Sequence, residues 1–169
     1  MKLAEDYKVA LVASALDLNV GATQVTKSIN MKNFHRATFL IDVGTMAGAN
    51  STLKVYSGAD DAALTSALAF KYAYGGATSI YLSTGILSDI LAAETVAVAA
   101  TGLVIAQATY PNFLLVVEVD ASIMDLAAAT PEQWLTLQFT DAGGATGLVS
   151  IFAVLEPRYS GNLSTTCFA

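Results

Sequence analysis

The sequence predicts an all-β fold, a β-sandwich of about eight to nine mainly antiparallel strands with at most one or two short helical turns. Two observations predict it: apolar and polar residues alternate with a period of two in several short segments, and Gly, Asn, Asp and Ser gather between those segments. A third is the hydrophobic content of 54% over 169 residues, which supports one core. We expect a single sandwich domain over residues 19–160, between an N-terminal arm, residues 1–18, and a C-terminal tail, residues 161–169.

Half-buried strands are the clearest elements, because their alternate residues are apolar. In one of them Leu135, Leu137 and Phe139 share a face, while the residues between them are Thr and Gln. Strands of this kind are predicted at Ala37–Thr45, Thr52–Ser57, Leu68–Tyr74 and Trp134–Thr140.

Other strands are apolar on both faces or weakly patterned. Leu114–Asp120 and Leu148–Leu155 carry apolar residues on both faces, which is typical of strands covered on both sides by a second sheet or by a neighbouring subunit. Weaker strands are predicted at Val25–Met31 and in the two halves of Ile90–Ala108. Residues 1–18 suit a helix as well as a strand, and we interpret them as an extended arm that includes a strand.

Turn-forming residues separate these strands at short, regular intervals, as in other all-β domains. The turns are predicted at Gly44–Asn50, Gly58–Asp61, Gly75-Gly76, Thr84-Gly85, Tyr110–Asn112 and Asp141–Gly147. A helical turn is expected within Ser122–Ala128. Another is expected at Thr130–Gln133, where Pro131 follows a capping Thr, although a plain turn suits the same residues.

The charge distribution argues against nucleic acid as a partner. The chain has 14 acidic and 8 basic residues, and no Lys or Arg occurs between Lys71 and Arg158. Proteins that neutralise phosphates need clustered basic side chains, which this pattern does not provide.

A membrane span or a secretory signal is also not expected. Glu5 and Asp6 stand where a signal peptide would begin its apolar stretch. The uncharged run from Thr95 to Val117 is long enough to cross a bilayer, but polar and turn-forming residues interrupt it, so two buried strands explain it better.

Residues able to perform catalysis are scarce. His35 is the only histidine, and no nucleophile motif accompanies it, so we interpret it as a structural residue at the start of a strand. Glu118, Asp120 and Asp125 lie close together in the sequence, with Glu94 also in the acidic half of the chain, and paired carboxylates can hydrolyse glycosides. Glu118 and Asp120 alternate on one strand face, which a solvated edge or a polar interface would equally produce.

Metal and nucleotide sites find no support in the spacing of the remaining residues. Asp60, Asp61 and Asp141 stand in predicted turns, where an acid commonly accepts hydrogen bonds from its own backbone, and no calcium-binding spacing surrounds them. Gly44–Gly48 lacks the Lys-Ser/Thr ending of a phosphate-binding loop, and Cys167 is interpreted as a free thiol in a reducing compartment. We therefore expect no enzymatic activity, no cofactor and no catalytic or metal-binding residue.

The low charge content predicts self-association. Charged residues make up 13% of the chain, about half the usual share of a soluble domain. Permanent interfaces resemble a core cut in half, so strand faces that are too apolar for a monomer are ordinary in a homo-oligomer.

Three stretches, together with Thr52–Ser57, resemble tailed-phage virion proteins; they are Ser28–Phe39, Val116–Ser122 and Glu156–Tyr159. The resemblance implies a jelly-roll-like sandwich on the capsid exterior, a decoration or cement protein whose partners are copies of itself, as a trimer, and the major capsid protein. It also implies assembly in the host cytoplasm and a final location on the virion surface.

An alternative function is a carbohydrate- or receptor-binding sandwich of a phage fibre or cell surface, since seven Tyr and one Trp could stack on sugars. Phe70, Tyr72 and Tyr74 alternate along one strand, a position more typical of core or interface aromatics. A hydrolase acting through Glu118 and Asp120 is the third class of function.

Overall fold

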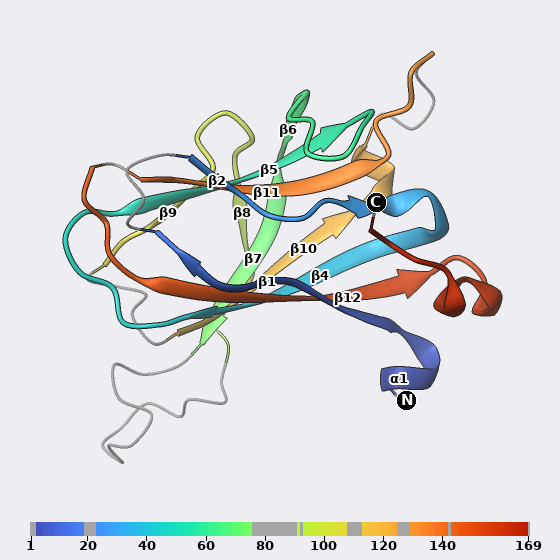
Figure 1. Ribbon diagram of the computed structural model, residues 1–169, viewed down its shortest axis with the longest axis horizontal. Coiled ribbons are helices and arrows are strands. Elements are labelled where there is room, and N and C mark those ends of the chain that lie inside the picture. Colours follow the sequence, from blue (N-terminus) through green and yellow to red (C-terminus); the bar gives the residue numbers. More distant parts are fainter. Residues whose placement is uncertain are drawn as a thin grey trace.

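The computed structural model describes residues 3–18, 23–75, 91, 93–107, 113–124, 129–141 and 143–168. These residues form twelve strands in two antiparallel sheets, and the only helical pieces among them are short, with five residues at most (Figure 1). The predicted all-β class is therefore confirmed.

The first sheet, here called sheet I, contains the long strands. Its order is β1 (Lys8–Asp17), β12 (Leu148–Pro157), β4 (Phe34–Val43), β10 (Phe113–Asp120), β7 (Phe70–Gly75) and β8 (Thr95–Ala97). Every pair of neighbours is antiparallel.

The second sheet, here called sheet II, is built on two long strands with short strands around them. Its order is β2 (Thr23–Val25), β11 (Trp134–Asp141), β5 (Ser51–Gly58) and β6 (Ser66–Leu68), while β3 (Ile29–Asn30) also pairs with β11 and β9 (Leu103–Ile105) also pairs with β5.

The strand pairing is nested, as expected for a jelly roll. The first long strand, β1, pairs with the last, β12; β2 and β3 pair with β11; β4 pairs with β10; and β5 pairs with β6 and β9. This is the pairing of one long antiparallel hairpin rolled into two sheets. β7 and β8 extend sheet I beyond it.

The strand count exceeds the predicted eight or nine because several predicted strands are divided. Leu68–Tyr74 was expected as one strand, but Leu68 ends β6 in sheet II and Phe70 begins β7 in sheet I. Both side chains are buried in the shared core, so the alternation of period two continues across the change of sheet.

Two further predicted strands are interrupted. Within Val25–Met31, residues 26–28 lie outside a strand, yet Thr26 still exchanges hydrogen bonds with Leu137 of β11. The two halves of Ile90–Ala108 are represented by the three-residue strands β8 and β9.

The described helical segments are α1 (Leu3–Asp6), η1 (Met31–Asn33), η2 (Ala121–Ile123) and η3 (Ser160–Ser164), more than the one or two turns expected. η2 begins the turn predicted within Ser122–Ala128, of which residues 125–128 lie outside the described part. Thr130–Gln133 forms no helix: the Gln133 N–H donates to the Pro131 carbonyl at 3.0 Å, so the plain-turn alternative is correct.

Most of the predicted arm belongs to sheet I, and the predicted tail is bonded to the sandwich. Residues 8–17 of the arm are β1, paired along β12. In the tail, the carbonyl of Cys167 accepts a hydrogen bond of 2.9 Å from the Asn30 N–H, and the Cys167 side chain is buried.

Among the predicted turns, Gly44–Asn50 and Asp141–Gly147 lie together, since Ala47 and Thr146 exchange backbone hydrogen bonds. The predicted turns at Thr84-Gly85 and Tyr110–Asn112, and Gly76, lie outside the described residues.

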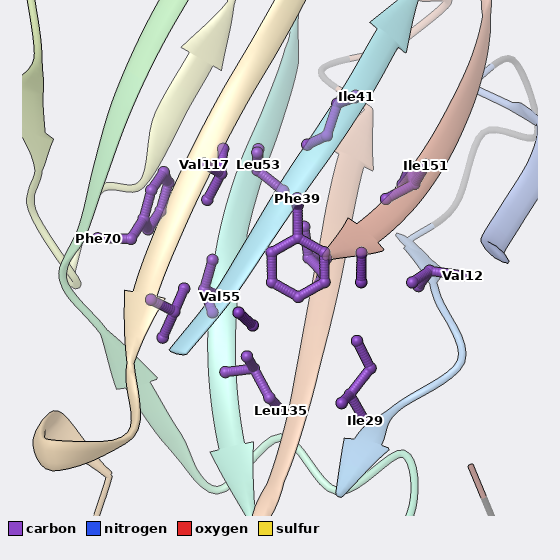
Figure 2. Packing of buried hydrophobic residues seen from close by; sticks show 14 of the residues in the cluster. Val12, Ile29, Phe39, Ile41, Leu53, Val55, Phe70, Val117, Leu135 and Ile151 are labelled. Carbon is purple, nitrogen blue, oxygen red and sulfur yellow. The ribbon is translucent and has the colours of Figure 1, made fainter. Parts of the chain in front are cut away.

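The core lies between the two sheets (Figure 2). Phe39 and Ile41 of β4 point toward Leu53 and Val55 of β5, and Leu135 of β11 lies beside them. All five side chains are fully buried, as the alternation in their strands predicted.

Candidate functional site

The outer faces of the two sheets differ in chemistry. On sheet II, Thr23, Thr140 and Thr52 stand side by side across three strands, followed by Val104 of β9. Gln138 and Lys54 occupy a neighbouring row. This face is mostly polar, as expected for a sheet side in contact with water.

The outer face of sheet I carries an uninterrupted apolar row. Leu11 is opposite Phe152, which is opposite Leu40, then Val116 and finally Ala73, so the row crosses five strands. Leu11 and Phe152 expose 48% and 43% of their surface although each stands inside a ten-residue strand.

Three more apolar side chains extend this row. Val9 and Val154 are paired beside it, and Leu114 precedes Val116 on the same side of β10. We call the seven residues the apolar face; they are Val9, Leu11, Leu40, Leu114, Val116, Phe152 and Val154. A contiguous exposed apolar patch of this kind typically marks an interaction site.

A cluster of charged side chains adjoins the apolar face at one end of sheet I. The cluster lines a cavity of about 330 Å³ and consists of Arg36, Lys71, Glu94, Glu118 and Asp120. Cross-strand register places Glu118 opposite Lys71 and Asp120 opposite Arg36. The Lys71 ammonium also forms an ion pair of 2.9 Å with the Glu94 carboxylate.

The sequence had singled out Glu118, Asp120 and Glu94 as candidate carboxylates, and the fold brings them together. Asp125, the fourth, lies outside the described residues. The pKa of Asp120 is lowered, first by hydrogen bonds from the Ser122 backbone N–H and hydroxyl, and further by the charges of Arg36 and His35.

Glycoside hydrolysis uses one ionised carboxylate together with one carboxyl group whose pKa is raised so that it can act as a general acid. In this cluster the pKa of Asp120 is lowered and Glu94 is paired with Lys71. The arrangement has the character of a polar rim beside an apolar surface.

The other residues considered for chemistry are engaged in local structure or lie apart. His35 is exposed on β4, and the described residues include no group of three or more His, Cys, Asp or Glu that could hold a metal ion. Burial raises the pKa of the Cys167 thiol.

The acids predicted in turns are found there. The Asp141 carboxylate accepts hydrogen bonds from the backbone N–H groups of Gly143, Gly144 and Ala145, at 2.8, 2.9 and 2.9 Å. Asp60 and Asp61 stand in the turn after β5, where the Ala63 N–H donates to the Asp60 carbonyl.

The aromatic residues of β7 pack inward. Tyr72 and Tyr74 are partly buried against the core, and the Tyr74 ring stacks on Phe113 with ring centroids 5.9 Å apart. Because these rings pack against the core, they leave little exposed surface on which a sugar could stack.

Sequence reasoning found only part of the apolar face. It identified Leu148–Leu155 as covered on both sides, but it did not select Val9 or Leu11. The alternation of Val9 and Leu11 within residues 8–17 was the available signal, and their neighbours became known only from strand order.

No protein-family model matches the chain, and no curated protein matches it. Among solved structures, the SPBc2 prophage-derived protein YomS is similar at a TM-score of 0.40 with 11% sequence identity, over 89% of this chain and 92% of that chain. At this TM-score the likeness carries no inference about function. In the part of the chain that is described, no helix is long and apolar enough to cross a membrane.

Proposed function

We propose that this chain is a non-enzymatic structural protein of a tailed-phage virion, a capsid decoration or cement protein that self-associates, as a trimer, and binds the outside of the head shell. Its partners are then copies of itself and the major capsid protein. The observation that carries the proposal is the apolar face of sheet I, which an isolated domain would leave in water.

The three stretches that resemble virion proteins lie together at one end of sheet I. This supports the resemblance, because segments that are distant in the sequence form one structural unit. The Arg158 N–H donates to the Asn33 carbonyl at 2.9 Å, joining the last stretch to the first. Asp120, in the middle stretch, stands opposite Arg36 in the first.

A decoration protein stabilises a shell by adding contacts that must break before the shell opens. Burial of apolar surface contributes about 25 cal/mol per Å². A modest contact made by each chain therefore has a large combined effect, because the linked chains of one trimer bind the shell through several contacts at once.

The proposal is tested with head shells of the phage that encodes the chain, prepared without it. Purified chain is added, the shells are sedimented, and the bound protein is counted and located by electron microscopy. We expect a fixed ratio of chain to capsid protein, density on the outer surface, and a higher temperature of shell disruption.

Chain that stays in the supernatant at saturating concentration would contradict the proposal. Binding to a glycan array by that same protein would favour the carbohydrate-recognition alternative.

A further inference from the structure

We propose that a second copy of this chain packs on the apolar face of sheet I. The inference deepens the self-association contained in the proposed function by naming the surface that makes the contact. It rests on strand register and exposure, and it holds whether or not the assembled protein binds a head shell.

The apolar face is large enough to form the apolar centre of an interface between copies. Four strands spaced about 4.8 Å apart and six residues long, at about 3.3 Å per residue, cover about 400 Å² in projection. A standard interface takes about 800 Å² from each partner, of which about 56–58% is apolar, or about 450 Å². The outward positions in this area also hold Thr38, Asp42, Glu118 and Ser150, so the apolar face supplies about half of the apolar part of one such interface. These four polar residues supply part of the polar rim that surrounds an apolar centre.

The composition of the face matches an interface between identical chains. Its central row, from Leu11 to Ala73, contains no polar side chain across five strands. Interfaces between identical subunits are more apolar than those between proteins that also exist apart.

Most of the charged residues beside the face stand next to a charge of opposite sign within the chain, whereas the exposed Asp42 stands between Ser150 and Leu114 on the same face. Lys71 is paired with Glu94, and Arg36 stands opposite Asp120. A partner that recognised this surface through charge would find few free charges to pair with, whereas an apolar surface on a second copy needs none.

A second copy of the chain is present from synthesis onward, at the same concentration as the first. An apolar face that waited for a different protein would remain in water until that protein arrived, with the aggregation risk that such patches carry. Packing against another copy removes the surface from water at once.

The first test is the mass of the purified chain by light scattering after size exclusion, with outward-facing variants. We expect the wild-type protein at two or more times the chain mass of 17.5 kDa. Leu11→Glu and Phe152→Glu should reduce the mass to 17.5 kDa while keeping the circular dichroism of a β protein.

The matched control is Val104→Glu, on the outer face of sheet II. Val104 is 50% exposed, close to the 48% of Leu11. This variant should keep the wild-type mass. A wild-type monomer at high concentration, or face variants that remain assembled, would overturn the proposal.

A pair of uncharged variants tests the packing of copies even if a charged variant fails to fold. Leu11→Cys and Val104→Cys place thiols at positions of similar exposure, while the native Cys167 is buried. We expect the thiol at position 11 to react with iodoacetamide at least tenfold more slowly than that at position 104, with equal rates in urea. Equal rates in the native protein would overturn the proposal.

The two proposals fail separately. If position 11 is protected in the purified chain but the chain does not bind shells, the packing of copies stands and the virion function fails. If position 11 is protected only after shells are added, the occupant is the shell protein, and the packing of copies on this face is overturned.

Discussion

At the scale of single residues, Glu132 connects sheet II to the segment before β11. The Ser57 and Ser66 hydroxyls donate to its two carboxylate oxygens at 2.6 and 3.0 Å, and Ser57 is fully buried. Glu132→Ala should lower the free energy of unfolding by about 1–3 kcal/mol, because it leaves a buried hydroxyl without its acceptor.

Urea denaturation measures this loss, and Glu132→Gln is the control. The Gln side chain keeps an acceptor for one serine and a donor for the other, so it should lose less. Equal losses for the two variants would indicate that the charge, and not the hydrogen bonding, stabilises this contact.

The hydrogen bonds of the Asp141 carboxylate make the stability of the protein depend on pH. Hydrogen bonds from the Ala145, Gly144 and Gly143 backbones hold its pKa below the ordinary value of 3.8. The ionised form is thus favoured in the folded state, so its contribution to stability is present above that ordinary value and is lost as the pH falls through the lower, folded-state pKa.

Asp141→Asn should therefore show a smaller loss of stability than the wild-type protein as the pH is lowered from about 5 to about 2. The measurement is urea denaturation across this range. Parallel pH profiles for the two proteins would show that this carboxylate has no part in acid unfolding.

These two residues also differ in what the sequence could reveal. Asp141 stands directly before a Gly-containing turn, so its local hydrogen bonds were predictable from neighbouring residues. The hydroxyl partners of Glu132 are 66 and 75 positions away, and only the strand order brings them within reach.

At the scale of elements, the loops at Gly44–Asn50 and Asp141–Gly147 close one end of the sandwich against each other. Gly48 has a φ of +82°, and a Cβ added there would lie 2.1 Å from the carbonyl oxygen of Gly144. Gly48→Ala should destabilise the protein by about 2 kcal/mol or more, through both strain and collision.

Thermal or urea denaturation measures this effect, with Gly161→Ala as the matched control. A Cβ at Gly161 would have no atom within 4 Å, so this change should stay within about 0.5 kcal/mol of the wild type. Similar stabilities for the two variants would contradict the close approach of the loops.

The division of Leu68–Tyr74 shows the limit of element prediction. Alternation reports which side chains face the core, and in a sandwich both sheets face the same core. Leu68 and Phe70 satisfy one pattern while belonging to different sheets, so periodicity correctly predicts their burial and cannot reveal the crossing between them.

At the scale of the whole molecule, the C-terminal tail lies against the sandwich. The Cys167 carbonyl is bonded to the Asn30 N–H, and the Lys27 ammonium lies 5.5 Å from the centre of the Phe168 ring. Cys167 is buried and its thiol pKa is raised by burial, so it reports on docking of the tail.

Iodoacetamide should label Cys167 at least about tenfold more slowly in the native protein than in urea, which corresponds to an opening free energy of about 1.4 kcal/mol or more. Mass spectrometry over time measures the rate. Rapid labelling of the folded protein would mean that the tail separates from the sandwich.

The sequence by itself determined the all-β class, most of the long strands and the burial of their alternate residues. These properties depend on neighbours along the chain, through the two-residue repeat of an extended backbone and the conformations of turn residues. The pairing of Glu118 and Asp120 on one strand face was predictable for the same reason.

Only the tertiary structure decided which strands are neighbours, and with them the apolar face and the charged cluster beside it. Leu11 and Phe152 are 141 positions apart in the chain, and their contact follows from the pairing of β1 with β12. A surface of this kind is a property of strand order, because side chains from distant segments become one patch only when hydrogen bonding places their strands side by side.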